Sequence, residues 1–215
     1  MTDYRVLDLF AGLGGFSSAF EESERWRVTT VDINERFDPD IQADVFDLRP
    51  SDFSGRTFDV VLASPPCVEF STMQNMNGGV EPSGDAIALV HHTIGLIKGL
   101  KPEFWFLENP FGRLRSYIGH PQATVTYCQY GEKYMKPTDL WGEHPPMTFR
   151  RCNYGDRCHL QNRGGNHAMR DLAGKRNRAE RAKVPHELSA AIRDPCEAAL
   201  DGEVAEQVTI GEVTA

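Results

Sequence analysis

The apolar run at residues 58–63 is the feature that most constrains the fold of this chain, because prolines stop it at once. The run contains β-branched valines and is followed by Ser-Pro-Pro-Cys, which ends at Cys67. Such a run predicts a buried strand, and the prolines predict a stiff turn. Since reactive groups of open α/β sheets lie at the carboxyl ends of strands, we expect Cys67 at such an edge. Taken alone, Cys67 is better explained as a buried structural cysteine.

A second apolar run, at residues 104–107, also ends in a polar side chain, Glu108. It follows a helix predicted over residues 86–100, where apolar residues fall on one face. A carboxyl group behind apolar neighbours holds its proton to a higher pH than in water. The sequence therefore predicts a thiol and an acid at the same edge of one sheet.

The first 50 residues have the pattern of a nucleotide-binding unit. A short strand at 5–10 leads into a glycine-rich turn at 11–16 and then a helix, which brings backbone N–H groups against a polar cofactor. Asp32, at a strand end, lies about where an acidic residue binds ribose hydroxyls. The carboxylate of Asp44 suits an adenine amino group. A plain strand-to-helix turn with two surface acids is the alternative interpretation.

These elements predict a single α/β domain built on a doubly wound, mostly parallel Rossmann-like sheet, which the 215 residues are long enough to form. No apolar run approaches the roughly 18 residues of a membrane span. The N-terminus also lacks the features of a signal peptide. We therefore expect an intracellular protein with no membrane partner.

Positive charge is concentrated in one part of a chain whose net charge is −8. Residues 1–110 carry 8 basic and 18 acidic side chains, residues 111–186 carry 14 and 6, and residues 187–215 carry 1 and 7. We expect a polyanion to bind the middle segment. A solvated basic face is the alternative.

Five cysteines at irregular spacing argue against a disulfide framework. Cys152, Cys158 and His159 lie close together in the sequence, with Cys128 as a fourth candidate and His167 as an alternative ligand. Three or four such ligands would hold zinc and organise a segment with too little core of its own. Free structural thiols are the alternative, because the spacing matches no standard C-x-x-C pair.

Taken together, three motifs resemble the cytosine carbon-5 DNA methyltransferase family. D-L-F-A-G-L-G-G-F-S at 8–17 is similar to its turn for S-adenosylmethionine, P-P-C-x-x-F-S at 65–71 to its nucleophile motif, and K-P-x-F-x-x-x-E-N at 101–109 to its acid motif. The resemblance covers residues 5 to about 142, with a fainter echo at 181–192. It implies methyl transfer from S-adenosylmethionine to carbon 5 of cytosine in DNA.

The resemblance also implies roles for individual residues. The Cys67 thiolate would attack ring carbon 6 while Glu108 donates a proton or hydrogen bond to ring nitrogen 3. Lys136 stands where the family has the first arginine of its Q-x-R-x-R motif. The target base would be flipped out of a duplex, with residues 68–80 as the lid. The implied cofactor contacts are Phe10, Ala11, Gly12, Leu13, Gly14, Gly15, Phe16, Asp32, Ile33, Asp44, Val45 and Pro65.

The main departure from the family lies downstream, where about 40 residues separate Trp141 from Arg181 and leave no room for a target-recognition domain. We therefore expect a catalytic domain at 1–142, a small basic irregular segment at 143–180, a helix at 181–200 that packs back on the catalytic domain, and a disordered acidic tail at 201–215. Side chains in the segment could track a phosphate backbone. These are Arg150, Arg151, Arg157, Arg163, Arg170, Lys175, Arg176 and Arg178.

The expected partner is double-stranded DNA, bound by a monomer in the cytoplasm or at the nucleoid. Sequence recognition would come from the basic segment or from a protein partner. Two alternatives remain open. In the first, the enzyme acts on RNA, single-stranded DNA or a free cytosine nucleotide. In the second, the chain is a non-catalytic nucleic-acid-binding relic of an enzyme.

Overall fold

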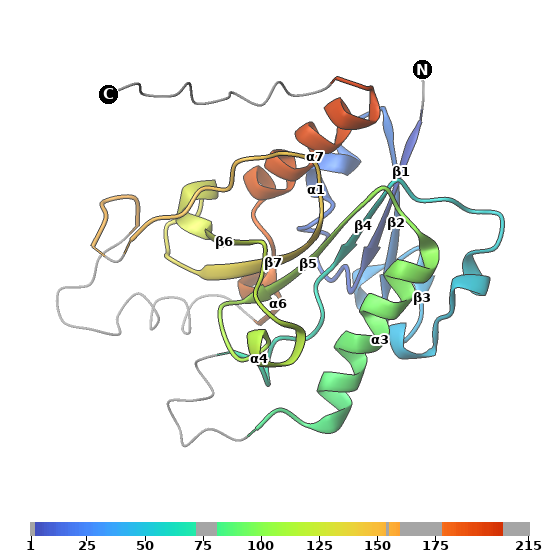
Figure 1. Ribbon diagram of the computed structural model, residues 1–215, viewed down its shortest axis with the longest axis horizontal. Helices are drawn as coiled ribbons and strands as arrows, with labels where there is room; N and C mark the ends of the chain where they lie inside the picture. Colours follow the sequence, from blue (N-terminus) through green and yellow to red (C-terminus); the bar gives the residue numbers. More distant parts are fainter. Residues whose placement is uncertain (1–2, 72–80, 154, 160–177, 204–215) are drawn as a thin grey trace, which may run out of the picture.

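The computed structural model describes residues 3–71, 81–153, 155–159 and 178–203, and its centre is a seven-stranded sheet of order β3-β2-β1-β4-β5-β7-β6 (Figure 1). The first five strands are parallel, whereas β7 runs antiparallel to β5 and β6 antiparallel to β7. The strands are β1 (Tyr4–Leu9), β2 (Trp26–Asp32), β3 (Ile41–Gln42), β4 (Val60–Ala63), β5 (Phe104–Pro110), β6 (Ala123–Thr126) and β7 (Pro137–Glu143). The prediction of a doubly wound, mostly parallel sheet is confirmed.

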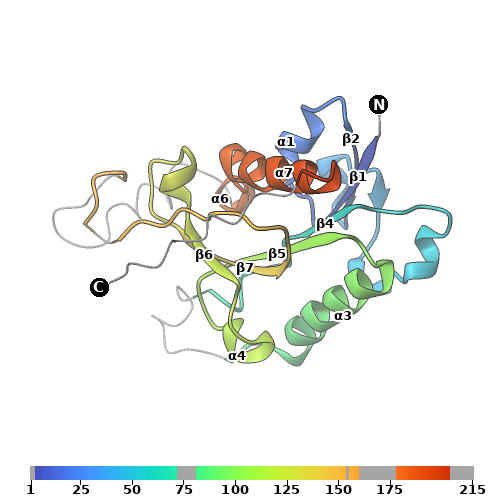
Figure 2. The same ribbon diagram turned by 45° about the horizontal axis from the view of Figure 1, so that its top comes forward.

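Helices cover both faces of this sheet, with α1 and α7 on one face and α3 on the other (Figure 2). The α-helices are α1 (Ser18–Glu21), α3 (Gly84–Leu100), α4 (Arg115–Ile118), α6 (Arg178–Ala182) and α7 (His186–Leu200). Single 3-10 turns are η1 (Glu35–Phe37), η2 (Val45–Asp47), η3 (Pro50–Phe53) and η4 (Tyr127–Tyr130). Helix α3 begins two residues before the predicted start, where the Ser83 side chain accepts a hydrogen bond from the Ala86 N–H.

Alternation along the strands divides the core into two layers. Val6 and Val60 pack under α1 and α7, whereas their neighbours Leu7 and Val61 pack against α3. Both faces of the central strands are therefore apolar, which is the reason these strands read as continuous apolar runs rather than as alternating ones.

The register of the central strands aligns the carboxyl ends of β1, β4 and β5. Ala63 of β4 pairs with Leu9 of β1 on one side and with Leu107 of β5 on the other. The segments that follow these residues therefore leave the sheet side by side. They are the glycine turn after β1, the proline turn after β4 and the residues from Glu108 onward.

Helix α7 and the residue that follows it are bound to the first 25 residues of the chain. Arg25 forms ion pairs with Glu197 and Asp201 at 2.8 and 2.6 Å, and the Ser189 hydroxyl donates to the Phe16 carbonyl at 2.6 Å. The helix expected over 181–200 is interrupted, since α6 ends at Ala182 and α7 begins at His186. The residue before a proline, here Pro185, is disfavoured in helical conformation.

Several expectations fall on residues that the structure does not describe. They are most of the lid at 68–80, much of the basic segment including His167, Arg163, Arg170, Lys175 and Arg176, and most of the acidic tail. No helix among the described residues is long and apolar enough to cross a membrane.

Candidate active site

The turn that carries Cys67 is joined to the strand that carries Glu108. The Asn109 side chain donates a buried hydrogen bond of 3.0 Å from Nδ2 to the Pro65 carbonyl. The two predicted motifs, 44 residues apart in the chain, therefore meet at one edge of the sheet. Pairing of Ala63 with Leu107 sets this meeting point, because Glu108 comes directly after Leu107.

The Cys67 thiol is half-buried and belongs to a compact turn. The Cys67 carbonyl accepts hydrogen bonds from the N–H groups of Phe70 and Ser71, at 3.1 and 3.0 Å. Phe70 is buried, and its carbonyl accepts from the Arg113 N–H at 2.9 Å. The backbone around the thiol is thus fixed on both sides, while the side chain keeps an accessible surface.

Glu108 is a buried acid with two partners. The Tyr127 hydroxyl donates to Glu108 Oε1 at 2.9 Å, and Lys136 Nζ lies 3.8 Å from the same oxygen. Burial raises the pKa of Glu108, and the Lys136 charge and the Tyr127 hydrogen bond offset this rise only in part. The carboxyl therefore holds its proton to a higher pH than an exposed glutamate, as a general acid requires.

Lys136 and Tyr127 also contact each other. Lys136 Nζ lies 4.3 Å from the centroid of the Tyr127 ring, and it reaches the Arg181 carbonyl at 3.5 Å. The sequence singled out Lys136 but missed Tyr127. Only tertiary packing brings Tyr127, which lies in η4, against a carboxyl on β5, and no spacing pattern marks it in advance.

The glycine turn after β1 depends on left-handed backbone. Gly12 and Gly14 have φ values of 54° and 65°, and Phe10 has a φ of 62°. Glycine adopts this left-handed conformation with little loss of free energy. The Asp32 carboxylate fixes the turn, since it accepts from the Gly12 N–H at 2.9 Å and from the Asn34 N–H at 2.8 Å. Asp44 instead follows the two-residue strand β3 and caps η2 by accepting from the Phe46 N–H.

Gly15 is the point where the C-terminal part of the chain meets this turn. A Cβ atom at Gly15 would lie 2.5 Å from the Lys183 side chain and 2.6 Å from the Val184 carbonyl oxygen. The fainter echo at 181–192 therefore packs directly on the predicted cofactor turn. Only glycine permits this approach.

Buried polar side chains gather around the same turn. The Ser64 hydroxyl has no partner, and the Asp8 carboxylate and the Ser17 hydroxyl make no hydrogen bond of good geometry, although they lie close enough for Ser17 to lower the pKa of Asp8. Burial raises the pKa of Asp8 to about 7, which Ser17 opposes only in part. Since buried polar groups in proteins are nearly always paired, these atoms fit a site that a polar cofactor completes.

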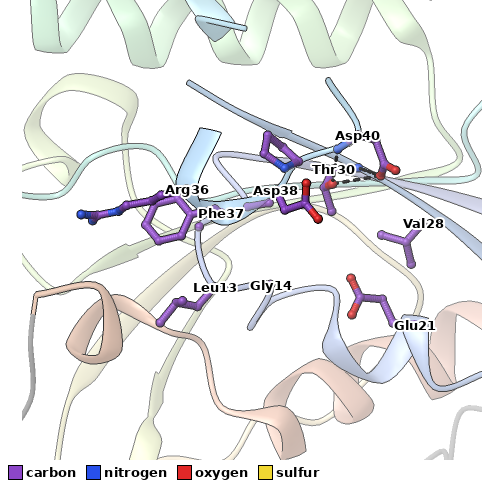
Figure 3. A pocket seen from close by; sticks show the side chains of 12 residues that line it. Leu13, Gly14, Glu21, Val28, Thr30, Arg36, Phe37, Asp38 and Asp40 are labelled. Carbon is purple, nitrogen blue, oxygen red and sulfur yellow. Dashed lines mark hydrogen bonds between the residues drawn. The ribbon is translucent and has the colours of Figure 1, made fainter. Parts of the chain in front are cut away.

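A cleft with a volume of about 580 Å³ adjoins the glycine turn (Figure 3). It is lined by residues 11–14 together with Thr30, Arg36 and Asp38, and Asp40 closes one side by accepting two hydrogen bonds from Thr30. Eight of the twelve predicted cofactor contacts do not line it, namely Phe10, Gly15, Phe16, Asp32, Ile33, Asp44, Val45 and Pro65. The cleft and the predicted contacts thus overlap only along the turn.

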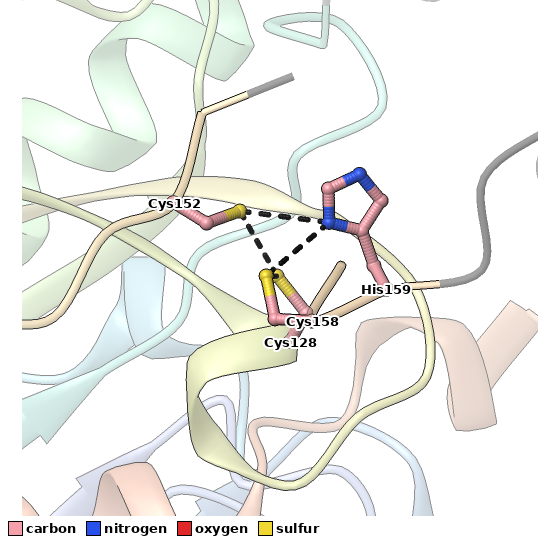
Figure 4. Close-up of side chains that lie close together, drawn as sticks. All are labelled: Cys128, Cys152, Cys158 and His159. Atoms are coloured by element: carbon pink, nitrogen blue, oxygen red, sulfur yellow. Dashed lines mark hydrogen bonds between the residues drawn. The ribbon is translucent and has the colours of Figure 1, made fainter. Parts of the chain in front are cut away.

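The four predicted metal ligands also come together. Their ligand atoms, which are the sulfurs of Cys128, Cys152 and Cys158 and a ring nitrogen of His159, all lie within 4.8 Å of one another (Figure 4). Burial raises the pKa of the Cys128 thiol to about 12.

Comparison with known proteins defines the class of this molecule. Residues 4–117 match the family described as C-5 cytosine-specific DNA methylase, so the chain belongs to that family. S-adenosylmethionine is the cofactor of the family. A solved structure, that of the Entamoeba histolytica methyltransferase EhMeth, has the same fold, with a TM-score of 0.51 and 16% identity over 71% of this chain and 58% of that one.

Individual relatives differ in how much of them the chain covers. It is 31% identical to a probable DNA (cytosine-5)-methyltransferase of Frog virus 3 (isolate Goorha), over 89% of this chain and all of the viral protein. It is 29% identical to the type II methyltransferase M.HaeII of Haemophilus aegyptius, over 51% of this chain and 35% of that protein. It is 26% identical to the tRNA (cytosine(38)-C(5))-methyltransferase of Mus musculus, over 65% of this chain and 37% of that protein.

Proposed function

We propose that this chain is a DNA (cytosine-5)-methyltransferase in which Cys67 is the nucleophile and Glu108 the acid. The observation that carries the proposal is the junction of the two motifs, where the Asn109–Pro65 hydrogen bond holds the thiol turn beside a buried carboxyl group. The Frog virus 3 relative, which the chain covers in full, supports DNA as the substrate.

In the proposed reaction, the Cys67 thiolate adds to carbon 6 of a cytosine that has been flipped out of the duplex. Glu108 donates a proton or hydrogen bond to ring nitrogen 3, so the electron pair of the 5,6 double bond makes carbon 5 nucleophilic. After carbon 5 is methylated, it loses its proton. The returning electrons restore the double bond and expel the Cys67 thiolate.

When bound, S-adenosylmethionine supplies the electrophilic methyl group. The glycine turn, Asp32 and Asp44 would hold it, with Ile33 and Val45 as apolar contacts. The buried Ser64 hydroxyl, which has no hydrogen-bond partner, supports a polar occupant at this edge of the sheet.

Lys136 and Tyr127 would keep the acid in place. Lys136 is a point charge in place of the family's forked arginine, and it lies 3.8 Å from Glu108. Burial and the neighbouring Glu108 carboxyl raise the pKa of Tyr127, so its hydroxyl remains a hydrogen-bond donor at neutral pH.

The test uses duplex DNA that contains 5-fluorocytosine, in which fluorine replaces the hydrogen on carbon 5 and cannot leave as a proton does, so a covalent complex accumulates. The wild-type protein should form this complex. Cys67→Ser should form none, and it should lower methyl transfer by more than about a thousandfold. Cys196→Ala, which removes a buried thiol in α7, should keep both activities. Undiminished transfer by Cys67→Ser would contradict the assignment.

RNA is the second candidate substrate, because the mouse relative is by its name a tRNA methyltransferase. Exposed arginines such as Arg151 and Arg157 would suit either polyanion. Parallel assays on duplex DNA, single-stranded DNA, tRNA and free cytosine nucleotide decide between these substrates. Binding of DNA without any trapped complex would instead support a non-catalytic relic.

A further inference from the structure

We propose that Cys128, Cys152, Cys158 and His159 bind a structural zinc ion that fastens the irregular segment after β7 to η4. Figure 4 shows the three sulfur atoms and the His159 ring facing one another from two separate parts of the chain. Cys128 lies in η4, and the other three ligands follow β7. The proposal goes beyond the proposed function and does not rest on it.

The distances suit one tetrahedral ion. Zinc–sulfur bonds of about 2.3 Å and zinc–nitrogen bonds of about 2.0 Å place sulfurs about 3.8 Å apart and a sulfur about 3.5 Å from a nitrogen. The Cys158–Cys128 sulfurs are 3.8 Å apart, and His159 Nδ1 lies 3.4 Å from Cys158 Sγ and 3.7 Å from Cys152 Sγ. The Cys128 and Cys152 sulfurs are 3.1 Å apart, so these two atoms would have to separate by less than about 1 Å to bind the same ion.

A disulfide explains this cluster less well. A sulfur–sulfur bond is about 2.05 Å long, whereas the Cys128 and Cys152 sulfurs are 3.1 Å apart. A disulfide would also involve only two of the four side chains, whereas the ligand atoms of all four lie close together. Thiolate and imidazole ligands in a tetrahedral arrangement select zinc over magnesium or calcium. Ligand atoms that all lie within 4.8 Å of one another leave room for a single ion.

Hydrogen bonds from backbone N–H groups to side-chain hydroxyls hold the two ligand-bearing segments together. The Cys152 N–H donates to Thr126 Oγ1 at 2.9 Å, and the Arg150 N–H donates to the Tyr130 hydroxyl at 2.7 Å. Cys152 is thereby placed beside Cys128. A turn closed by hydrogen bonds between Asn153 and Asp156 then reverses the chain toward the last two ligands.

The described part of this segment has little regular structure and few buried residues, although Met147 and Phe149 pack against the main core. Among the described residues from 144 to 159, none lies in a helix or strand, and only Pro145 and Cys152 are buried. Metal binding supplies folding free energy where an apolar core is missing. The same ion would steady η4, whose Tyr127 contacts Glu108.

The first experiment measures zinc in wild-type protein that has been purified without added metal or chelator. We expect one zinc per chain by elemental analysis. Exchange for cobalt should give the visible absorption of a tetrahedral ion and a thiolate-to-cobalt charge-transfer band. Protein without zinc that also fails to take up cobalt, or that has fewer than five titratable thiols after denaturation, would overturn the proposal.

Variants then assign the ligands. Cys158→Ser and His159→Ala should lose most of the zinc to a competing chelator at concentrations that leave the wild type loaded. Cys158→His, which restores a ligand, should keep it. Cys67→Ser is the matched control, because it removes a thiol outside the cluster and should retain a full equivalent of zinc while methyl transfer is lost. Zinc content therefore separates failure of this proposal from failure of the proposed function.

Stability gives a second measurement. A chelator should lower the melting temperature of the wild type and leave that of Cys158→Ser unchanged. Because the Cys158 side chain is exposed, its replacement should cost nothing in a protein that binds no metal. Equal melting temperatures of the wild type and Cys158→Ser, both before and after the chelator, would contradict the proposal.

Discussion

Opposing influences set the protonation of Glu108. Burial raises its pKa most strongly, and Asp139 adds to the rise, whereas Lys136 and the Tyr127 hydroxyl lower it. Protonated Glu108 is the form that donates to cytosine in the proposed reaction. Its partners therefore influence both the orientation of the carboxyl group and the pH above which this group loses its proton.

Tyr127→Phe tests this arrangement. Removal of the hydroxyl takes away a hydrogen bond that favours the carboxylate, so the pKa of Glu108 should rise further. The alkaline limb of kcat/KM should then move to higher pH. At neutral pH the rate should fall about tenfold, as expected for the loss of one positioning hydrogen bond of about 1.4 kcal/mol.

The control is Tyr4→Phe, which loses a similar tyrosine–carboxylate hydrogen bond to Asp201, of 2.7 Å, far from Glu108. Its pH profile should match that of the wild type. A purely structural role for Tyr127 would lower the rate without moving the alkaline limb, and that result would contradict a positioning role.

At the scale of elements, α7 and the linker before it close the glycine turn. Gly15 lies against Val184, and the Ser189 hydroxyl accepts from the Ala19 N–H while it donates to Phe16. The turn is thus formed by the first strand and helix of the chain but is covered by the last helix.

Gly15→Ala tests this closure. The added methyl group would meet backbone atoms of Val184 at less than 3 Å, so the linker has to move. We expect a loss of about 1–3 kcal/mol in the free energy of unfolding, typical of overpacking, together with weaker binding of S-adenosylmethionine. Urea denaturation and calorimetric titration measure the two effects.

Gly95→Ala provides the opposite control. Gly95 is exposed within α3, and a Cβ atom there meets nothing within 4 Å. Alanine should therefore stabilise the protein by up to about 1 kcal/mol through helix propensity. If both variants had the same stability, the contact between Gly15 and the linker would be of no consequence.

At the scale of the whole molecule, the uneven distribution of charge matters most. Residues 1–110 carry 8 basic and 18 acidic side chains, whereas residues 111–186 carry 14 basic and 6 acidic ones. An acidic protein therefore has one region suited to a nucleic-acid backbone. Arg151 and Arg157 are exposed members of this region that the structure describes.

The double variant Arg151→Ala, Arg157→Ala should weaken DNA binding at low salt. The slope of log K against log salt concentration should shrink by about 2, since each phosphate contact contributes about 0.9. Fluorescence anisotropy over a salt series measures both quantities. Arg27→Ala with Arg56→Ala, at the amino ends of β2 and β4, is the matched control and should leave the slope unchanged.

The sequence by itself determined the sheet, the order of its motifs and the family. Buried parallel strands must be apolar on both faces, so residues 58–63 and 104–107 stand out as runs that end in Cys67 and Glu108. Strand ends converge at one edge, which makes the position of these two side chains predictable from the chain order. The Cys and His residues near 152–159 were also visible as candidate ligands.

Tertiary structure decided which side chains meet across long stretches of sequence. Three contacts follow from the way β6, η4 and the C-terminal helices fold back on the sheet. They join Tyr127 to Glu108, Val184 to Gly15 and Cys128 to Cys152. The cleft of about 580 Å³ likewise adjoins the glycine turn and is not lined by all the expected cofactor contacts. Such contacts depend on packing between distant segments, and local periodicity and spacing carry no record of that packing.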